Sequence, residues 1–555
     1  MSDGLLSIGS SGLLAFQRGL SVTGHNISNS ATEGYSRQRL DLNTRTPEFA
    51  GNSYFGTGVK VGGVNRIADQ FVESQLRTAT SSSAHYSLFH DYARRVDSLL
   101  ANPDSGMAPA LQSFFAAIQD VATDPTSLPA RQVLMAEGES LSDRFGFLNQ
   151  RLEEQRALVN GQIQTTADEI NVLANSLAEL NTNIVKATAR AGGAPPNDLL
   201  DQRDRLVGEL AERVNVTIVP QGDGALNVFV GNGQSLVVGN TASRLTAEPL
   251  GEDPMQVGVG HVAANGNVAD ISRFMTGGRL GALLEVRASV LDTAQNSLGQ
   301  AAVGLAMEFN AQHAQGLDLE GNEGGDFFVQ PQPQILARSD NSAEGLPAVT
   351  VEDPGQLTTE DYRLRFNGAD SVWELRQVSN NQLVDRFEPS ESPRSVAGLS
   401  IDTDAYTAAP ENGDSFLIRP TRSAAGEIGT VIEGPARIAA ASSVAPTGVG
   451  DNANALELAQ LQDRRFLAGE TATLEGAYSA MIGEVGTRTR QAELAADSHS
   501  RLLDEARNQR DSISGVNLDE EAANLLRYQQ AYQAAAQVIA VSSTLFDTLL
   551  GAVRR

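Results

Sequence analysis

The stretch ARQVLMAEGESLSDRFGFLNQRLEEQRALVNGQIQTTADEINVLANSLAELNTNIVKATARAGG, residues 130–193, decides the fold because one helical pattern runs through it. A helix of about 60 residues extends roughly 90 Å at 1.5 Å per residue, so the pattern predicts a rod. Gly192 and Gly193 end it as C-cap residues would. An eleven-residue step after Leu152 predicts a stutter that locally relaxes the supercoil. The apolar residues at heptad positions are Leu141, Phe145, Leu148, Leu152, Ile163, Ile170, Leu173, Leu177, Leu180 and Ile184.

Both ends of the chain are predicted to be helices with one narrow apolar stripe each. The stripes, which we call seams, are too narrow for a globular core but suit the pairing of two helices. We expect the two seams to pair in the assembled state and to be disordered in the free chain, because a two-helix seam buries too little to offset chain entropy. The N-terminal seam is Leu6, Leu13, Leu20 and Ile27, and the C-terminal seam is Leu518, Leu525, Tyr532, Ile539 and Phe546.

The interior contains segments with the two-residue period of antiparallel strands. Three lie between residues 214 and 239 (VNVTIV, LNVFV, SLVVG) and three between 362 and 419 (YRLRF, VWELRQV, SFLIR). The predicted fold class is therefore mixed and mainly α, with long terminal coiled-coil helices and a helical rod that carries inserted antiparallel β domains. The expected domains are 1–65 (N-terminal axial helix and hairpin arm, paired with 516–555), 66–215 (rod), 216–270 (β insertion), 271–316 (helix returning to the rod), 317–450 (acidic outer β domain), 451–515 (rod) and 516–555 (C-terminal axial helix).

Composition excludes several classes of function. The formal net charge is −27, so attraction to nucleic acid is absent and anionic membranes should repel the chain. The absence of cysteine excludes thiol catalysis, disulfides and cysteine-based metal sites. The N-terminus lacks the basic and apolar regions of a signal peptide, and we expect neither a membrane span nor a cleaved signal.

No candidate for catalysis or cofactor binding rises above chance. The six histidines lack the spacing of a zinc helix. The segment GLDLEGNEGGDFF, residues 316–328, superficially resembles a calcium loop, but Glu323 replaces the required glycine and Val329 the final glutamate. Acidic pairs such as Asp402 and Asp404 are expected by chance among 68 acids. We therefore predict no enzyme activity, no metal and no cofactor.

One polar block follows the N-terminal seam: GHNISNSATEGYSRQRLDL, residues 24–42. Asn29 and Thr32 can bond free groups at a helix end, and Gly34 can take a positive φ. We interpret Tyr35, Arg37 and Gln38 as locking the turn against a neighbouring subunit, which makes this block an assembly joint. A plain C-cap before a hairpin is the alternative, and it explains Gly34 but not the residues that follow.

This block resembles the motif that ends the N-terminal helix of the flagellar axial proteins, the family of rod, hook and hook-associated proteins. Residues 515–550, GVNLDEEAANLLRYQQAYQAAAQVIAVSSTLFDTLL, are similar to the C-terminal helix that this family shares. Further blocks at 111–145, 195–214 and 311–328 resemble the hook-associated members. One departure is Glu33, where the family motif often has proline.

The resemblance implies a structural adaptor that polymerises as a ring at the hook–filament junction and joins hook to filament. It also implies an extracellular location in the bacterial flagellum, reached by type III export. The implied partners are further copies of the chain, the hook protein, hook-associated protein 3 and an export chaperone that masks the C-terminal seam. Two alternatives remain: another axial protein, either the hook protein or hook-associated protein 3, and a secreted hydrolase carried on an axial scaffold.

Overall fold

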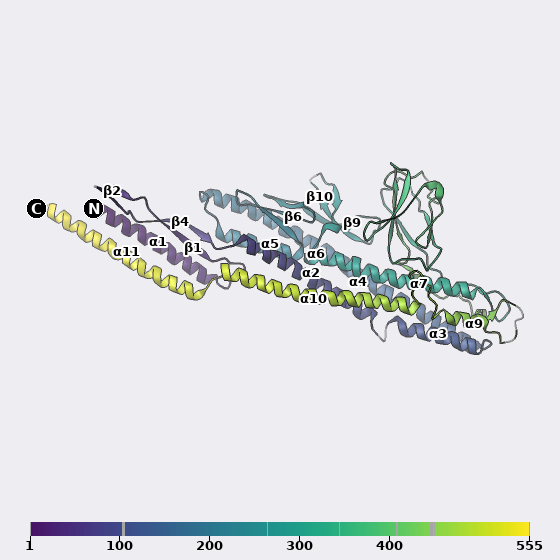
Figure 1. The fold of residues 1–555 in the computed structure, drawn as a ribbon. Coiled ribbons are helices and arrows are strands. Elements are labelled where there is room, and N and C mark those ends of the chain that lie inside the picture. The colour runs from purple at the N-terminus through teal and green to yellow at the C-terminus, as the bar shows by residue number, and fades with distance from the viewer. Residues whose placement is uncertain are drawn as a thin grey trace.

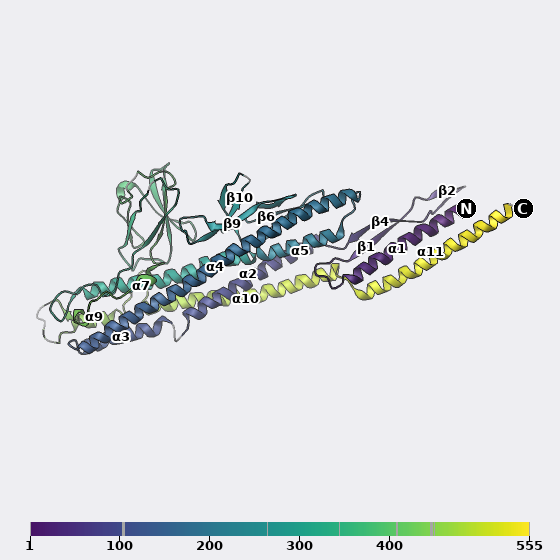
Figure 2. The same ribbon diagram turned by 180° about the vertical axis from the view of Figure 1, so that it is seen from behind.

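The computed structural model describes residues 2–50, 52–102, 106–263, 265–342, 344–406, 409–444, 448 and 450–553. The outermost residues of the two expected terminal domains, 1, 554 and 555, lie outside these ranges, as do 445–447 and 449 of the expected outer domain. The molecule is elongated, with helices aligned along its length and both chain ends at the same end (Figure 1). A compact β lobe stands off the side of the helical rod near the opposite end (Figure 2).

The helices make the long axis of the molecule. They are α1 (Ser2–Ser28), α2 (Gln70–Leu100), α3 (Met107–Thr123), α4 (Leu128–Arg190), α5 (Asn197–Arg213), α6 (Gly278–Val286), α7 (Asp292–His313), α8 (Ala424–Glu427), α9 (Ala453–Gln460), α10 (Leu474–Ser514) and α11 (Leu518–Val553). A π-helical turn (Arg287–Leu291) joins α6 to α7, and short 3-10 turns lie at Ser272–Phe274, Pro389–Glu391 and Pro435–Arg437.

The predicted rod helix is confirmed as α4, which has 63 residues. Ser127 caps its start by accepting a hydrogen bond from the Ala130 N–H, and Gly192 and Gly193 follow its end with φ of +63° and +96°. The fully buried Val159 belongs to the same stripe and divides the step between Leu152 and Ile163 into seven and four residues. The total is still eleven, so the expected stutter stays a prediction.

Small β-sheets cover one side of the rod. The strands predicted between 214 and 239 are confirmed as β5 (Val216–Pro220), β6 (Leu226–Val230) and β7 (Gln234–Val238), which form an antiparallel sheet with β8 (Thr241–Ala242). A second sheet has the order β11-β10-β9 and contains β9 (Arg244–Pro249), β10 (Val257–Val262) and β11 (Val268–Asp270).

The outer β lobe contains a five-stranded antiparallel sheet of order β13-β20-β15-β16-β17 and a three-stranded sheet of order β14-β19-β18. The three strands predicted from YRLRF, VWELRQV and SFLIR are confirmed as β15, β16 and β20 of the larger sheet. Its core surrounds Trp373, which is 1% exposed. The lobe strands are β13 (Gln334–Ala337), β14 (Ala348–Val351), β15 (Tyr362–Asn367), β16 (Val372–Gln377), β17 (Leu383–Phe387), β18 (Arg394–Val396), β19 (Leu399–Asp402) and β20 (Ser415–Arg419).

The boundaries expected for this outer domain, 317–450, are too wide. Phe327 and Phe328 are fully buried in the rod, where their rings lie 6.1 and 5.6 Å from that of Phe114 on α3. The returning segment also belongs to the rod, because Arg131 on α4 donates a hydrogen bond to the Ile438 carbonyl. Strands β12 (Gly316–Leu317) and β21 (Ala441–Ser442) pair beside it. Apolar packing that alternation does not reveal thus places the lobe between about residues 330 and 420.

At the other end of the molecule, α1 lies between a β-hairpin arm and α11, an arrangement that we call the terminal slab (Figure 1). The arm consists of β1 (Gln38–Thr44) and β4 (Val59–Arg66), with a tip formed by β2 (Glu48–Ala50) and β3 (Ser53–Phe55). The hairpin pairs Leu42 with Val61, and a bulge after Asp41 pairs Leu40 with Val64. The Ser11 hydroxyl accepts a hydrogen bond from the Val59 N–H at 3.3 Å, which fixes the arm on α1.

The two terminal helices pair, and the α1 side of the contact is a stripe of glycines that the predicted seam did not include. A Cβ added to Gly9 would lie 2.8 Å from Ile539, a residue of the predicted C-terminal seam, and one added to Gly19 would lie 2.9 Å from the Tyr528 ring. Small residues let the two helix backbones approach closely. Leu6 is 45% exposed, Leu518 54% and Phe546 47%, whereas Leu13, Leu20, Ile27, Leu525, Tyr532 and Ile539 are half-buried.

Helix α11 leaves most of its apolar surface uncovered within the chain. The helical stretch Leu474–Ala552 contains an 18-residue window with a mean hydropathy of 1.3, of which 6% is buried. By length and composition alone, such a helix passes the test for a membrane span. The expectation that the chain has no candidate membrane span therefore underestimated how apolar this helix is. It relied on the polar residues Gln537, Ser542 and Ser543, which interrupt the apolar stretch.

Candidate assembly joint between the terminal slab and the rod

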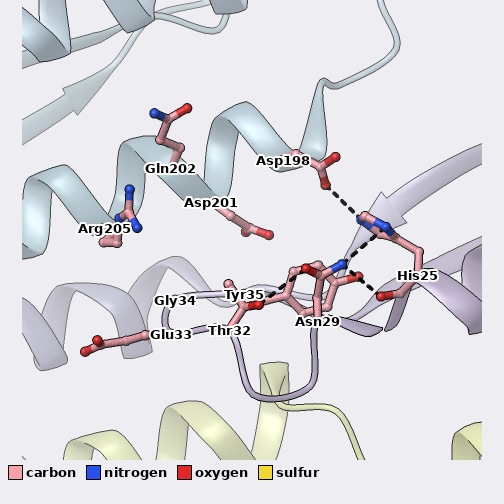
Figure 3. Close-up of a pocket in the computed structure, with 10 residues that line it drawn as sticks. All are labelled: His25, Asn29, Thr32, Glu33, Gly34, Tyr35, Asp198, Asp201, Gln202 and Arg205. Atoms are coloured by element: carbon pink, nitrogen blue, oxygen red, sulfur yellow. Dashed lines mark hydrogen bonds and ion pairs between the residues drawn. The ribbon is translucent and has the colours of Figure 1, made fainter. Parts of the chain in front are cut away.

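The joint predicted from residues 29–38 lies where the slab meets the rod. The loop between α1 and β1 contacts the first turns of α5, the end of α10 and the start of α11. Figure 3 shows the loop beneath α5, with Asp198 and Asp201 pointing down toward Tyr35 and His25. Helix α1 and strand β1, from the start of the chain, therefore meet α5 from its middle and α10 and α11 from its end.

The turn itself forms as the residue types predict. Helix α1 ends at Ser28, and the N–H of the next residue, Asn29, donates to the His25 carbonyl at 3.1 Å. The Thr32 N–H donates to the Asn29 carbonyl at 2.9 Å, and the Thr32 hydroxyl donates to the Asn29 side chain at 3.3 Å. Gly34 has a φ of +79°, a conformation that favours glycine.

A buried asparagine that sequence reasoning missed holds the turn together. Asn26 is 1% exposed, and its Nδ2 donates to the Gln38 carbonyl at 2.9 Å. Its Oδ1 accepts hydrogen bonds from the Gln38 N–H at 2.9 Å and from the Tyr35 hydroxyl at 2.7 Å. The side chain thus mimics a paired strand residue and satisfies both backbone groups of Gln38. The available signal was its position three residues after Thr23, on the buried side of an otherwise apolar helix.

Tyr35 is a buried hydrogen-bond donor. It is 9% exposed, and its ring meets that of His25 edge-on at 5.6 Å. Burial raises the pKa of the Tyr35 hydroxyl well above its usual value, and the negative charges of Asp198, Asp201 and Glu521 act in the same direction. The phenol therefore stays protonated and continues to donate to Asn26.

Arg37 joins the loop to both C-terminal helices. Its N–H donates to the Ser514 carbonyl at the end of α10, at 2.8 Å. Its guanidinium donates to Glu521 at 2.9 Å and to Glu520 at 2.6 Å, both in the first turn of α11. Negative side chains at a helix N-terminus are favourable, and Glu521 is almost completely buried. Arg37 therefore fixes the bend between α10 and α11.

Helix α5 supplies the acidic side of the joint. Asp198 accepts a hydrogen bond from Gln38 Nε2 at 2.8 Å, and Asp201 accepts one from the Ser36 N–H at 3.1 Å. Arg66, at the end of the arm, pairs with Asp201 at 3.0 Å. Burial raises the pKa of Asp201, although the hydrogen bonds from Ser36 and Arg66 oppose that shift. Sequence analysis assigned no role to these residues, because their contacts span more than a hundred positions.

The predicted joint residues bond to groups of their own chain. Tyr35, Arg37 and Gln38 were expected to find their partners in a neighbouring subunit, yet all three have partners within the chain. The reason is that the chain ends return to the same place, so that α10 and α11 supply the groups expected from another copy. A role for the joint in contacts between subunits stays a prediction.

A cavity of about 330 Å³ lies between the loop and α5 (Figure 3). Within it His25 Nε2 lies 3.3 Å from Asp198, a pairing that hydrolases use. The other ring nitrogen faces the Asn29 amide at 3.3 Å, not a nucleophilic hydroxyl. Over the described residues, no group of three histidine or acidic side chains is placed to hold a metal ion. The arrangement suits fixing a joint better than catalysis.

Comparison with known proteins agrees with this geometry. Residues 93–328 match the model of the flagellar hook-associated protein FlgK helical domain, and residues 507–552 match that of the flagellar basal body rod FlgEFG protein C-terminal region. The chain is 35% identical to flagellar hook-associated protein 1 of Salmonella typhimurium over 98% of this chain and 99% of that protein. It is 33% identical to flagellar hook-associated protein 1 of Escherichia coli, again over 98% of this chain and 99% of the other.

A solved structure shares the fold. The flagellar hook junction protein FlgK from Burkholderia pseudomallei matches with a TM-score of 0.73 and 24% identity, over 80% of this chain and 100% of that chain. The long helices with inserted antiparallel sheets are therefore a known arrangement. The chain belongs to the flagellar hook-associated protein 1 (FlgK) family.

Proposed function

We propose that this chain is a structural adaptor that polymerises at the hook–filament junction of the bacterial flagellum and joins hook to filament. The observation that carries the proposal is the match to hook-associated protein 1 of Salmonella typhimurium over nearly the full length of both chains, which includes both terminal helices. The terminal slab supports it physically, because exposed apolar side chains such as Leu14 and Leu526, 60% and 57% exposed, call for neighbours.

The proposed partners are further copies of the chain, the hook protein on one side and hook-associated protein 3 on the other. We also propose an export chaperone that masks the C-terminal seam of α11 before assembly. The helix provides exposed apolar side chains that such a partner would bind, with the seam residues Leu518 and Phe546 both about half exposed. Transport without a cleaved signal to the external flagellum belongs to the same proposal.

A catalytic role has less support. The buried carboxylates at the base of the β lobe are held by arginines: Asp253 pairs with Arg419 at 2.6 Å and Glu252 with Arg363 at 3.0 Å. Such pairs neutralise the groups that a glycosidase or protease would need free. The hydrolase alternative therefore gains nothing from the lobe.

The test is deletion of the gene in its source bacterium, with complementation by the intact chain. Loss of the chain should leave completed hooks without filaments and release filament subunits into the medium, and complementation should restore attachment. Filaments that attach normally to hooks in the deletion strain would overturn the proposal.

A further inference from the structure

Three exposed aromatic side chains form the tip of the hairpin arm. Phe49 is 61% exposed, Tyr54 72% and Phe55 57%. Phe49 and Tyr54 are cross-strand partners whose rings lie 5.0 Å apart, so they form one surface. Aromatic residues that a small hairpin holds in water are costly to solvate and are typical of protein contacts.

A second apolar surface lies on the last turns of α11. Val541 is 58% exposed, Leu545 48%, Phe546 47% and Leu550 48%. Contacts of α11 with α1 use other positions, among them Tyr528, Ala535 and Ile539. At 3.6 residues per turn, Val541 and Leu545 lie on the side of α11 away from these contacts, whereas Phe546, seven residues after Ile539, continues the side that faces α1. The outer face is therefore formed by Val541 and Leu545, which no described residue covers.

The two surfaces lie on opposite sides of the terminal slab and at the same end of it. Figures 1 and 2 show the same order of layers from both sides: arm, α1, then α11. Near the N-terminus of α1, Gly9 faces Ile539 on one side while Gly58 of the arm approaches Ile8 on the other. The aromatic tip and the last turns of α11 are thus level with each other along the slab.

Two copies placed side by side in the same orientation would bring the tip of one against α11 of the next. Such a contact joins two different surfaces and repeats from copy to copy, which builds a ring or helical row. Charges at the base of the slab agree with this stacking, because the arm exposes Arg39 and Asp41 while the first turns of α11 expose Asp519 and Arg527. Arg39 of one copy would pair with Asp519 of the next, and Asp41 would pair with Arg527.

We propose that the aromatic tip, Phe49, Tyr54 and Phe55, docks on the outer face of α11 around Val541 and Leu545 in a second copy of this chain. The inference rests on the proposed function, since it names the contact through which the chain polymerises. It commits to a second copy because the two surfaces are level only for copies in one orientation. A different axial protein as occupant is an outcome that the test distinguishes.

The absence of native cysteine allows a direct test. The full chain with Tyr54→Cys and Val541→Cys is expressed in the deletion strain, and isolated hooks are treated with a short thiol–thiol cross-linker. The expected result is a ladder of dimers, trimers and higher multimers of this chain, whereas either single variant alone gives no ladder. The control pair Tyr54→Cys with Val172→Cys, which lies on α4 and is 65% exposed, should give no ladder either.

A second variant keeps the proposal testable if the cysteine pair does not assemble. Tyr54→Ser with Phe55→Ser changes exposed side chains, so the free chain should keep its far-UV spectrum while incorporation at hook ends falls at least tenfold. The matched change Leu383→Ser with Val384→Ser, on the exposed edge strand β17, should incorporate normally.

Several outcomes would overturn the inference. One is normal filament attachment without a ladder, another is a cross-link from residue 54 to a different protein, and a third is normal incorporation of the serine variant. Any of these with normal filament attachment leaves the proposed function standing. Failure of the intact chain to support attachment would instead contradict the proposed function.

Discussion

Replacing Arg422 with methionine should release the β lobe from the rod. Arg422 donates to Asp292 on α7 at 2.8 Å, to Asp361 before β15 at 2.5 Å and to Asn296 at 3.1 Å. Arg422 and Asp361 are less than 10% exposed. Burial raises the pKa of Asp361 despite its arginine neighbours, whereas the charges of Arg156 and Arg422 outweigh the effect of burial on Asp292 and lower its pKa to about 2.

The methionine preserves volume but leaves the Asp361 carboxylate with one cation among the described residues, Arg419 at 3.5 Å, and the Asn296 amide at 3.1 Å. Removing one partner of a buried ion pair costs about 3 to 5 kcal/mol, because the remaining charge loses its compensation. With a dependence on urea of about 2 kcal/mol per molar, a loss of 3 kcal/mol lowers the unfolding midpoint by about 1.5 M. The fluorescence of Trp373 measures this transition selectively, because it is the only tryptophan and lies in the lobe core.

The matched control is Arg338→Met, in the same lobe, where the ion pair with Asp340 has side chains 45% and 65% exposed. Exposed pairs contribute at most about 1 kcal/mol, so its midpoint should barely move. The effect of Arg422→Met should also shrink in acid, because protonation of Asp361 removes the uncompensated charge. Equal shifts for the two variants, or an effect that grows in acid, would refute the reasoning.

Three further predictions concern the joint, the slab and the rod. Asn26→Ala should lower the free energy of unfolding by about 2 to 3 kcal/mol, because both backbone groups of Gln38 stay buried without partners. Tyr35→Phe should lower it by only about 1 kcal/mol, because one hydrogen bond is lost. Urea unfolding followed by far-UV circular dichroism measures both changes, and equal costs would contradict the role of Asn26. Gly19→Val should speed hydrogen exchange throughout α11, because the new side chain meets the Tyr528 ring. Gly4→Val is the control and should leave exchange unchanged, because nothing lies within 4 Å of a Cβ at that position. Slow exchange in both variants would show that close approach of the α1 and α11 backbones is unnecessary. The pKa of His313 is lowered by burial, and its Nε2 accepts a hydrogen bond from the Ala439 N–H, so stability should be complete above about pH 6.5 and decline as the pH falls below it. The melting temperature of the wild type should therefore fall more between pH 7 and 5 than that of His313→Gln, and parallel curves would exclude His313 as the cause.

The sequence predicted those parts of the fold that depend on local periodicity. Helix α4 and the strands of both β regions follow from the spacing of their own apolar residues. The predicted N-terminal seam missed the contact with α11 because a heptad template selects large residues, whereas Gly9, Gly12 and Gly19 make the contact. A stripe without side chains carries no hydrophobic signal. It is visible only when glycines at helical spacing are treated as a surface.

The joint was located from sequence, but its chemistry was not. The predicted loop residues are present at the turn, yet Asn26 was missed although its partners, Tyr35 and Gln38, are close in sequence. Asp201 and Glu521 could not be assigned because their partners are remote in the chain. The charged cluster around Arg422 escaped for the same reason. Asp292, Asp361 and Arg422 come from three segments that alternation treats as independent. Single-sequence patterns specify which face of an element is buried, but not which buried charges meet.

The difference between the joint and the outer slab surfaces follows from the forces that each uses. Hydrogen bonds and ion pairs are directional and saturable, and the joint satisfies them within one chain: Asn26 and Arg37 bond the elements that return to the turn. Apolar contact is non-directional and grows with area, so a surface that the chain leaves uncovered keeps its full capacity for a neighbour. Phe49, Tyr54 and Val541 remain exposed because, in the part of the chain that the structure describes, no element beyond the three layers of the slab covers them. Under the docking proposed above, the directional bonds of the joint hold the slab at one angle, and the exposed apolar surface is what a second copy would cover.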